Sequence, residues 1–457
     1  MTFKNILLAG TALGAAAILA GPAFAGSSYE NDAVKAQIEA LQQQIDDMKI
    51  QYGNELKDLK EKQEAVQVGL KDGRPTFKTG DGLFTFAIRG RAHLDMAAYN
   101  QSEGDKSRAG NTTLDGGENF RRAELGIEGT FLRDWGYKLN IQFGDSGAEK
   151  DGFIKDAFMS YNGFKPFGAD LALKVGAIQT PMTLDDSTSS NDITFMERAT
   201  AANLATSLGA GDGRMSYGAE LSTGMFYVST FYTTEVVTAT ANTSNEGSNI
   251  VARLAANFQP MDKTNVHVGA SGTYGTDVQG TVRYRDRPEL RVDANRLVDT
   301  GAIAADESYV YGPELAASYG PVKLQGEYYV YTVDRKGALS DVDFNSWYVQ
   351  ASWVITGEAY TYDKGVAAYK GVKPASPFTP GGGIGAFELA ARYSETDLND
   401  ANIFGGKQDI WTVGLNWYAN NNVRLMLNYL NVDVEDRIAL NNNFGHDAYA
   451  ARLQFAF

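Results

Sequence analysis

Three arginines occupy every second position of one short segment. Arg283, Arg285 and Arg287 alternate with a tyrosine and an aspartate. Alternate side chains of an extended chain lie on the same side, so the three guanidinium groups would form a row. A guanidinium keeps its charge and offers fixed donors that match the oxygens of phosphate or carboxylate. If the segment lines a pore, the row would pass anions from one weak site to the next. The alternative interpretation of the same pattern is a solvated surface loop.

Further cations occupy alternate positions in segments whose other residues are mostly apolar. They are Arg89, Arg91, Arg122, Lys138, Lys174, Arg253, Lys323, Arg392 and Arg452. A charge on the lipid-facing side of a membrane strand costs about 2–4 kcal/mol at the middle of the bilayer, so these side chains should point inward. The alternative to a cationic path is a wetted interior with both signs of charge, which Glu327 and Glu388 fit.

Strands are the elements that would hold these residues. From Leu83 onward, segments of about ten residues alternate between apolar and polar side chains, with short turns between some and long polar connections between others. About sixteen strands are predicted, at 83–97, 120–131, 136–144, 153–161, 170–178, 215–222, 224–235, 248–258, 264–274, 307–319, 321–333, 342–355, 384–396, 408–418, 423–431 and 445–457. Residues 277–291 also look extended, but tight turns at 259–262 and 320–321 make 275–306 one connection and keep the strand number even. A closed antiparallel barrel of this size leaves an aqueous channel.

Both ends of the sequence have recognisable signals. Lys4, the apolar residues 6–19 and Ala23-Phe24-Ala25 predict a secretory signal peptide over residues 1–25, with a membrane anchor as the alternative. At the other end, alternating apolar residues lead to a terminal Phe457. This pattern resembles the signal by which the barrel-assembly machinery recognises outer-membrane proteins.

Residues 29–70 have a helical period instead of a strand period. Apolar residues recur in steps of three and four, at Val34, Ile38, Leu41, Ile45, Met48, Tyr52 and Leu59. The pattern predicts a periplasmic coiled coil with a linker over 26–75, ahead of a barrel over 76–457. No other helical segment of this length could receive the helix, which favours self-association over packing on its own domain.

Composition excludes other classes of protein. No part of the mature chain approaches 18 apolar residues, so no transmembrane helix is expected. Cysteine is absent, which removes disulfides, thiolate nucleophiles and cysteine metal sites. The three histidines lie in no recognisable nucleophile motif, so neither an enzyme nor a cofactor is expected. A formal net charge of −15 argues against nucleic-acid binding.

Four motifs resemble the phosphate-selective porin O/P family. They are Asn119-Phe120-Arg121-Arg122-Ala123-Glu124, Thr188-Ser189-Ser190 with Phe195-Met196-Glu197-Arg198, Tyr284-Arg285-Asp286-Arg287-Pro288-Glu289-Leu290, and Tyr311-Gly312-Pro313-Glu314-Leu315. The resemblance spans roughly residues 83–457. It implies a homotrimer of sixteen-stranded barrels in the outer-membrane bilayer and a third loop, near 179–214, that folds into the lumen.

The resemblance also implies passage of small inorganic anions along arginines and lysines. The matching cations are Arg121, Arg122, Arg283, Arg285 and Arg287, with Arg89 or Arg91, and Asp156 would match an acidic residue near the constriction. The sequence departs from the family at the third loop, which carries Asp185 and Asp186 and has no lysine between 175 and 214.

The sequence therefore predicts an all-β outer-membrane porin for passive diffusion of small anions, with phosphate or polyphosphate as the solute. The predicted anion path comprises Arg89, Arg91, Arg121, Arg122, Lys138, Asp156, Arg283, Arg285 and Arg287. The alternative is a diffusion pore without phosphate selectivity, whose coiled coil tethers it to the peptidoglycan of the cell wall.

Overall fold

The computed structural model describes residues 28–64, 66–71, 73–144, 152–237, 246–437 and 443–457. The predicted signal peptide, residues 1–25, lies outside the described residues. The chain divides into a first unit that contains the helix α1 (Ser28–Glu64) and a second unit from Val66 to Phe457. Among the described residues, no helix is long and apolar enough to cross a membrane.

The helix α1 has 37 residues and carries the predicted heptad pattern. Its apolar positions Val34, Ile38, Leu41, Ile45, Met48, Tyr52 and Leu59 are all exposed in the single chain. The helix ends at Glu64. Residues 67–71 form a strand, β1 (Gln67–Lys71), that pairs with β2 (Arg74–Lys78). Coiled coils bury an apolar stripe of this kind between helices. The structure contains one chain, so self-association of α1 stays a prediction.

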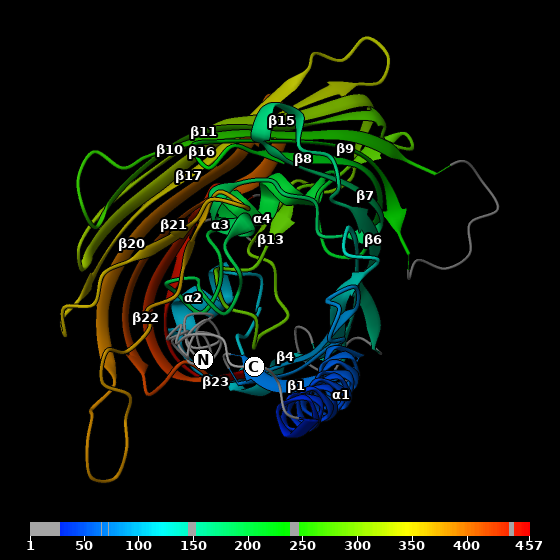
Figure 1. Cartoon of the computed structure of the whole chain (residues 1–457). Coiled ribbons are helices and arrows are strands. Elements are labelled where there is room, and N and C mark those ends of the chain that lie inside the picture. The colour runs from blue at the N-terminus through cyan, green and yellow to red at the C-terminus, as the bar shows by residue number, and fades with distance from the viewer. Residues whose placement is uncertain (1–27, 65, 72, 145–151, 238–245, 438–442) are drawn as a thin grey trace. The chain divides into compact units, whose positions relative to one another are not determined.

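Sixteen strands form a closed antiparallel barrel in the described part of the chain (Figure 1). They are β3 (Thr85–Asn100), β4 (Gly117–Phe131), β5 (Trp135–Gln142), β6 (Phe153–Tyr161), β7 (Asp170–Ile178), β8 (Arg214–Ser222), β9 (Phe226–Val236), β10 (Ser248–Phe258), β11 (Thr264–Asp277), β15 (Ile303–Tyr319), β16 (Val322–Arg335), β17 (Val342–Val354), β20 (Ala386–Asp400), β21 (Ile403–Tyr418), β22 (Val423–Glu435) and β23 (Phe444–Ala456). Each predicted strand corresponds to one of them. The predicted connection 275–306 contains only the two-residue strands β12 (Thr281–Val282), β13 (Arg285–Asp286) and β14 (Val298–Asp299) before β15 begins.

The two faces of the strands follow the predicted alternation. In β3, Arg91, His93 and Asp95 are buried inside the barrel, while Leu94 and the earlier residue Phe86, on the other face, are partly exposed. Alternation places charge toward the lumen because the outer face meets hydrocarbon. The inward assignment of the strand cations is confirmed.

One bulge in β4 departs from this alternation. His93 lies opposite Arg122, but the next residue, Leu94, lies opposite Phe120, so Arg121 is an extra residue in the strand. A bulge of this kind lets two successive side chains point to the same face. Arg121 and Arg122 are accordingly both buried inside the barrel.

Three connections fold into the lumen. The first, residues 179–213, contains α3 (Leu184–Ser187) and α4 (Thr200–Ser207), which lie within the ring of strands (Figure 1). The second, residues 278–302, contains β13 and β14. The first insertion agrees with the third loop expected near 179–214. The connection 101–116 carries the remaining short helix, α2 (Glu103–Arg108).

The third insertion was not predicted. Residues 355–385 carry the hairpin of β18 (Thr361–Asp363) and β19 (Ala368–Lys370). They start at the barrel end where the short turns lie, since the Val354 amide donates to the carbonyl of Pro321 at 2.8 Å. Arg253 of β10 holds the hairpin inside by donating to the carbonyls of Val366 and Ala367, at 3.0 and 2.8 Å.

The barrel closes where β23 pairs with β3. Pairing runs from Asp447 opposite Asn100 to Ala456 opposite Arg91, and Phe457 adds two backbone hydrogen bonds to Gly90, at 3.0 and 2.9 Å. A Cβ atom at position 90 would lie 2.5 Å from the phenyl ring of Phe457, so a larger residue there would displace that ring. An unpaired strand edge in lipid is prohibitive, which makes this contact part of barrel closure.

Replacing Phe457 by serine should lower the folded yield in the outer membrane severalfold, because the last strand then loses the ring that covers Gly90. The measurement is the heat-modifiable fraction on unheated gels of outer membranes at native expression. Phe258→Ser, which also removes an outward phenyl group at the short-turn end, is the control and should fold normally. Equal folded amounts of the two variants would contradict the role of Phe457.

Candidate functional site: a charged passage beside the barrel wall

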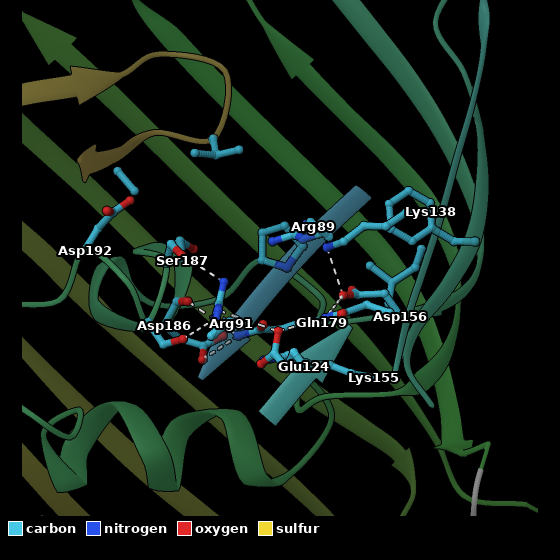
Figure 2. Close-up of a pocket in the computed structure, with 18 of the residues that line it drawn as sticks. Arg89, Arg91, Glu124, Lys138, Lys155, Asp156, Gln179, Asp186, Ser187 and Asp192 are labelled. Atoms are coloured by element: carbon cyan, nitrogen blue, oxygen red, sulfur yellow. Dashed lines mark hydrogen bonds and ion pairs between the residues drawn. The ribbon is translucent and has the colours of Figure 1, made fainter. Parts of the chain in front are cut away.

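The lumen contains a cavity of about 270 Å³ against the wall formed by β3 to β8. Side chains from these strands, from the insertion 179–213 and from the hairpin β18–β19 line it (Figure 2). A second cavity, of about 780 Å³, shares Arg89, Arg91 and Lys370 with the first and reaches the short turn at 420–422. The two cavities therefore adjoin and lead to the short-turn end of the barrel.

Cations outnumber carboxylates in the smaller cavity. Its charged lining consists of seven cations, Arg89, Arg91, Lys138, Lys155, Lys174, Arg198 and Lys370, and five carboxylates, Glu124, Asp156, Asp186, Asp192 and Glu220. Six neighbouring strands, β3 to β8, supply most of them, so the charges follow one side of the lumen. An ion in this cavity meets an excess of positive charge.

A second bulge adds a lysine to this wall. Asn140 of β5 lies opposite Asp156, but Ile141 lies opposite Ile154, so Lys155 is an extra residue in β6. Lys155 and Asp156 are both buried inside the barrel. As at Arg121 and Arg122, a bulge turns two neighbouring charged residues to the lumen.

Ion pairs hold the more accessible cations in place. Lys138 lies 2.8 Å from Asp156, and Lys174 lies 2.6 Å from Glu220. Arg89 donates to Glu128 at 2.9 Å. A cation that already has a carboxylate neighbour attracts a passing anion more weakly than an isolated one, which suits passage more than tight binding.

Three cations surround the carboxylate of Glu124. Lys155 lies at 3.1 Å, Arg122 at 3.3 Å and Arg91 at 3.6 Å from it. All four side chains are buried. Asp212 lies 3.5 Å from Lys155, so two carboxylates reduce the repulsion among three cations and the cluster stays positive as a whole.

The insertion 179–213 forms the opposite side of the cavity. Arg198 donates to the carbonyls of Asp185, Asp186 and Thr188, each at 3.0 Å, and so fixes the turn that follows α3. Arg91 on the wall donates to the hydroxyl of Ser190. The amides of Leu184 and Asp185 donate to Glu327 of β16, which anchors the start of α3.

Two carboxyls of this insertion have raised pKa values. Burial raises the pKa of Asp186 above its ordinary range, although Arg198 opposes the effect. Burial likewise raises the pKa of Asp192 against the influence of Lys370. Both carboxyls line the cavity, so its net charge depends on their protonation.

The structure brings together most of the predicted anion-path residues. Arg89, Arg91, Lys138 and Asp156 line the cavity. Arg122 lies behind them against Glu124, and Arg121 pairs with Glu197 at 2.8 Å.

The predicted arginine row is wrong at Arg287. Arg283 and Arg285 are exposed, as a shared side requires, but Arg287 is buried, because the strand β13 ends at Asp286 and Pro288 follows. Arg283 is also neutralised, since it donates to Asp299 at 2.7 Å. Arg291, which the row did not include, reaches toward the lumen wall and lies 3.3 Å from Glu197.

Sequence reasoning missed Lys155, Arg198 and Lys370, which line the cavity. Strict alternation in β6 assigns the Lys155 side chain to the lipid-facing side. The free-energy cost of a charge in lipid was the one signal that could have indicated a bulge at this position. Lys370 lies in the unpredicted hairpin. Lys174 was assigned inward correctly but was not selected as a path residue.

Comparison with known proteins gives a consistent picture. A sequence model described as "Phosphate-selective porin O and P" matches residues 86–457. Porin O of Pseudomonas aeruginosa is 26% identical over 411 residues, which cover 83% of this chain and 90% of that protein. An uncharacterised protein of Caulobacter vibrioides is 27% identical over 398 residues, covering 84% of this chain and 76% of its own.

Solved structures agree at the level of the fold. An anion-selective porin from Comamonas acidovorans superposes with a TM-score of 0.51 at 16% sequence identity. The superposition covers 82% of this chain and 100% of the porin. At this identity the likeness shows a shared barrel architecture and nothing of the solute.

Proposed function

Because the chain belongs to the phosphate-selective porin O and P family, we propose that this outer-membrane porin passes small inorganic anions by diffusion, with a weak preference for oxyanions such as phosphate. The protein is a pore and not an enzyme. One observation carries the proposal: the smaller cavity is lined by seven cations and five carboxylates.

The sign of the nearby charges matters more than the net charge of the chain. The formal charge of −15 is spread over the whole sequence. Salt screens distant exposed charges over about 8 Å at physiological ionic strength. A unit charge about 4 Å from an ion is worth ~4 kcal/mol before desolvation at an effective dielectric constant near 20. Lys138, Lys155 and Lys174 on adjacent strands therefore favour anions.

The pairing of these cations supports weak instead of tight binding. Lys138 and Lys174 each have a carboxylate within 2.8 Å. A tight phosphate site would need several donors without such neighbours, and the predicted row that could supply them is interrupted at Arg287. The five carboxylates of the lining also support the alternative of a pore without phosphate selectivity, and the ion-selectivity experiment separates the two.

Replacing Lys138 and Lys174 together by glutamine should lower the anion-over-cation permeability ratio. We expect at least a roughly threefold fall, because a loss of only ~0.7 kcal/mol in attraction suffices for that change. Reversal potentials in KCl gradients across planar bilayers measure the ratio, and phosphate block of chloride current reports the oxyanion preference. Lys165→Gln with Lys336→Gln removes two cations outside the cavity lining and should leave both readouts unchanged. A cation-selective wild type would contradict the proposal.

Acidification should increase the preference for anions. Burial raises the pKa of Asp186 and of Asp192. Both carboxyls therefore take up protons at a higher pH than an ordinary aspartate, whose pKa lies near 3.9, so acidification removes negative charge from the cavity. The carboxyl of Asp212 stays ionised to a lower pH, since the cations Lys155, Arg122 and Arg198 outweigh burial and lower its pKa. Reversal potentials at several pH values test this, and Asp192→Asn should flatten the pH dependence. A ratio that falls on acidification would contradict it.

We also propose a homotrimer assembled through α1. The exposed heptad positions of α1 would bury one another in a three-helix coiled coil. Ile38→Glu with Ile45→Glu should convert the trimer to monomers in mild detergent while each barrel stays heat-modifiable. Gln37→Glu with Gln44→Glu adds the same charge beside the apolar positions and should leave the trimer intact. Native mass spectrometry gives the readout, and a monomeric wild type would rule the trimer out.

A further inference from the structure

Glu197 contacts arginines from three separate parts of the barrel. Arg121 of β4 donates to both carboxylate oxygens, at 2.8 and 3.0 Å. Arg452 of β23 donates to the same carboxylate at 2.7 Å. Arg291, from the insertion 278–302, places its Nε atom 3.3 Å away. One carboxylate on the insertion 179–213 thus connects a wall strand, the closing strand and the second insertion.

This cluster lies away from bulk water. The side chains of Glu197, Arg121 and Arg452 are 6%, 8% and 1% exposed. Asp95 adds a second carboxylate, 2.6 Å from Arg452, and Asp286 adds a third, 3.5 Å from Arg291, so the three guanidinium groups face three carboxylates. Although burial opposes it, the three guanidinium groups hold the pKa of Glu197 well below its ordinary value, and the carboxylate stays charged.

The backbone around Glu197 is bound as well. Arg452 donates to the carbonyl of Met196, and Arg392 of β20 donates to the carbonyl of Glu197 at 3.1 Å. Arg392 also pairs with Glu289 of the insertion 278–302. Both insertions are therefore fixed to the barrel at the same place.

We infer that Glu197 is a positioning residue whose carboxylate holds three arginines together and thereby sets the width of the ion passage. Its neighbour Arg198 lines the cavity and holds the carbonyls of Asp185, Asp186 and Thr188. A shift of Glu197 moves Arg198 and, with it, the turn that forms one side of the passage. The inference rests on the pore function proposed above but concerns the rigidity of the passage and not its sign of charge.

The test is single-channel recording of Glu197→Gln, which keeps the shape and the hydrogen-bonding oxygen of the side chain and removes its charge. The unbalanced guanidinium groups then repel, and the insertion loosens. We expect spontaneous partial closures to become roughly tenfold more frequent, within the range of coupling energies known for contacting charged residues. Removing one guanidinium in the same background, as Glu197→Gln with Arg291→Gln, should return closures toward the wild-type frequency.

The controls separate the inference from the proposed function. Glu220→Gln also removes one lumenal carboxylate, but Glu220 pairs with Lys174 on the wall, so this variant should change ion preference without adding closures. If wild type proves not to prefer anions, the proposed function fails and closure frequency still tests Glu197. Closure frequencies equal to wild type in Glu197→Gln, or no rescue by the second change, would overturn the inference. If Glu197→Gln does not fold, Glu197→Asp decides, because its shorter side chain keeps the charge but cannot reach all three guanidinium groups. Closure frequencies equal to wild type in Glu197→Asp would overturn the inference.

Discussion

The pairing of β23 with β3 is the interaction on which the rest of the molecule depends. No backbone group in the hydrocarbon can be left without a partner, so the first and last barrel strands must meet along their length. Once the ring is closed, every strand has one face toward lipid and one toward the lumen. The cost of a charge in lipid then directs the cations inward without any specific partner. The contact of Phe457 with Gly90 completes this closure at the short-turn end.

Bulges and insertions convert a generic barrel into a particular passage. Two bulges add Arg121 and Lys155 to the inward set, each beside another charged residue. Within the insertion 179–213, α4 packs against inward-facing apolar side chains of β16 and β17, while the insertion 278–302 contacts β4, where Asn119 donates to the carbonyl of Arg291. The charged cavity lies between the insertion 179–213 and the wall of β3 to β8.

The fold was predictable from the sequence because its main signal is strict alternation. The strands, their number and the connection 275–306 all follow from that alternation and from tight turns. Arg89, Arg91 and Lys138 were identified for the same reason, and Asp156 was identified through the family resemblance. Lys155 was missed because a bulge breaks the alternation by one residue, and no single-sequence pattern marks its position. Arg121 was included through family resemblance alone.

The remaining differences come from tertiary contacts. Arg287 departs from the predicted row because the chain turns at Pro288, and Glu289 pairs with Arg392 inside the barrel. The hairpin β18–β19 was not expected, since its anchors are Arg253 and His267 on distant strands. Neither contact has a local signature in the sequence. The fold could therefore be predicted from the sequence, whereas these parts of the site became apparent only in the structure.

The apolar cluster inside the barrel also gives the insertions a temperature dependence. Leu204 of α4, Val333 of β16 and Phe344 of β17 pack together in the lumen, where unfolding would expose them to water and not to lipid. Unfolding that exposes apolar surface to water has a positive heat-capacity change. The hydrophobic stabilisation of the folded state therefore weakens on cooling. The wall of the barrel is held by hydrogen bonds within a lipid solvent and lacks this dependence. Cold should therefore loosen the lining of the passage before it affects the wall.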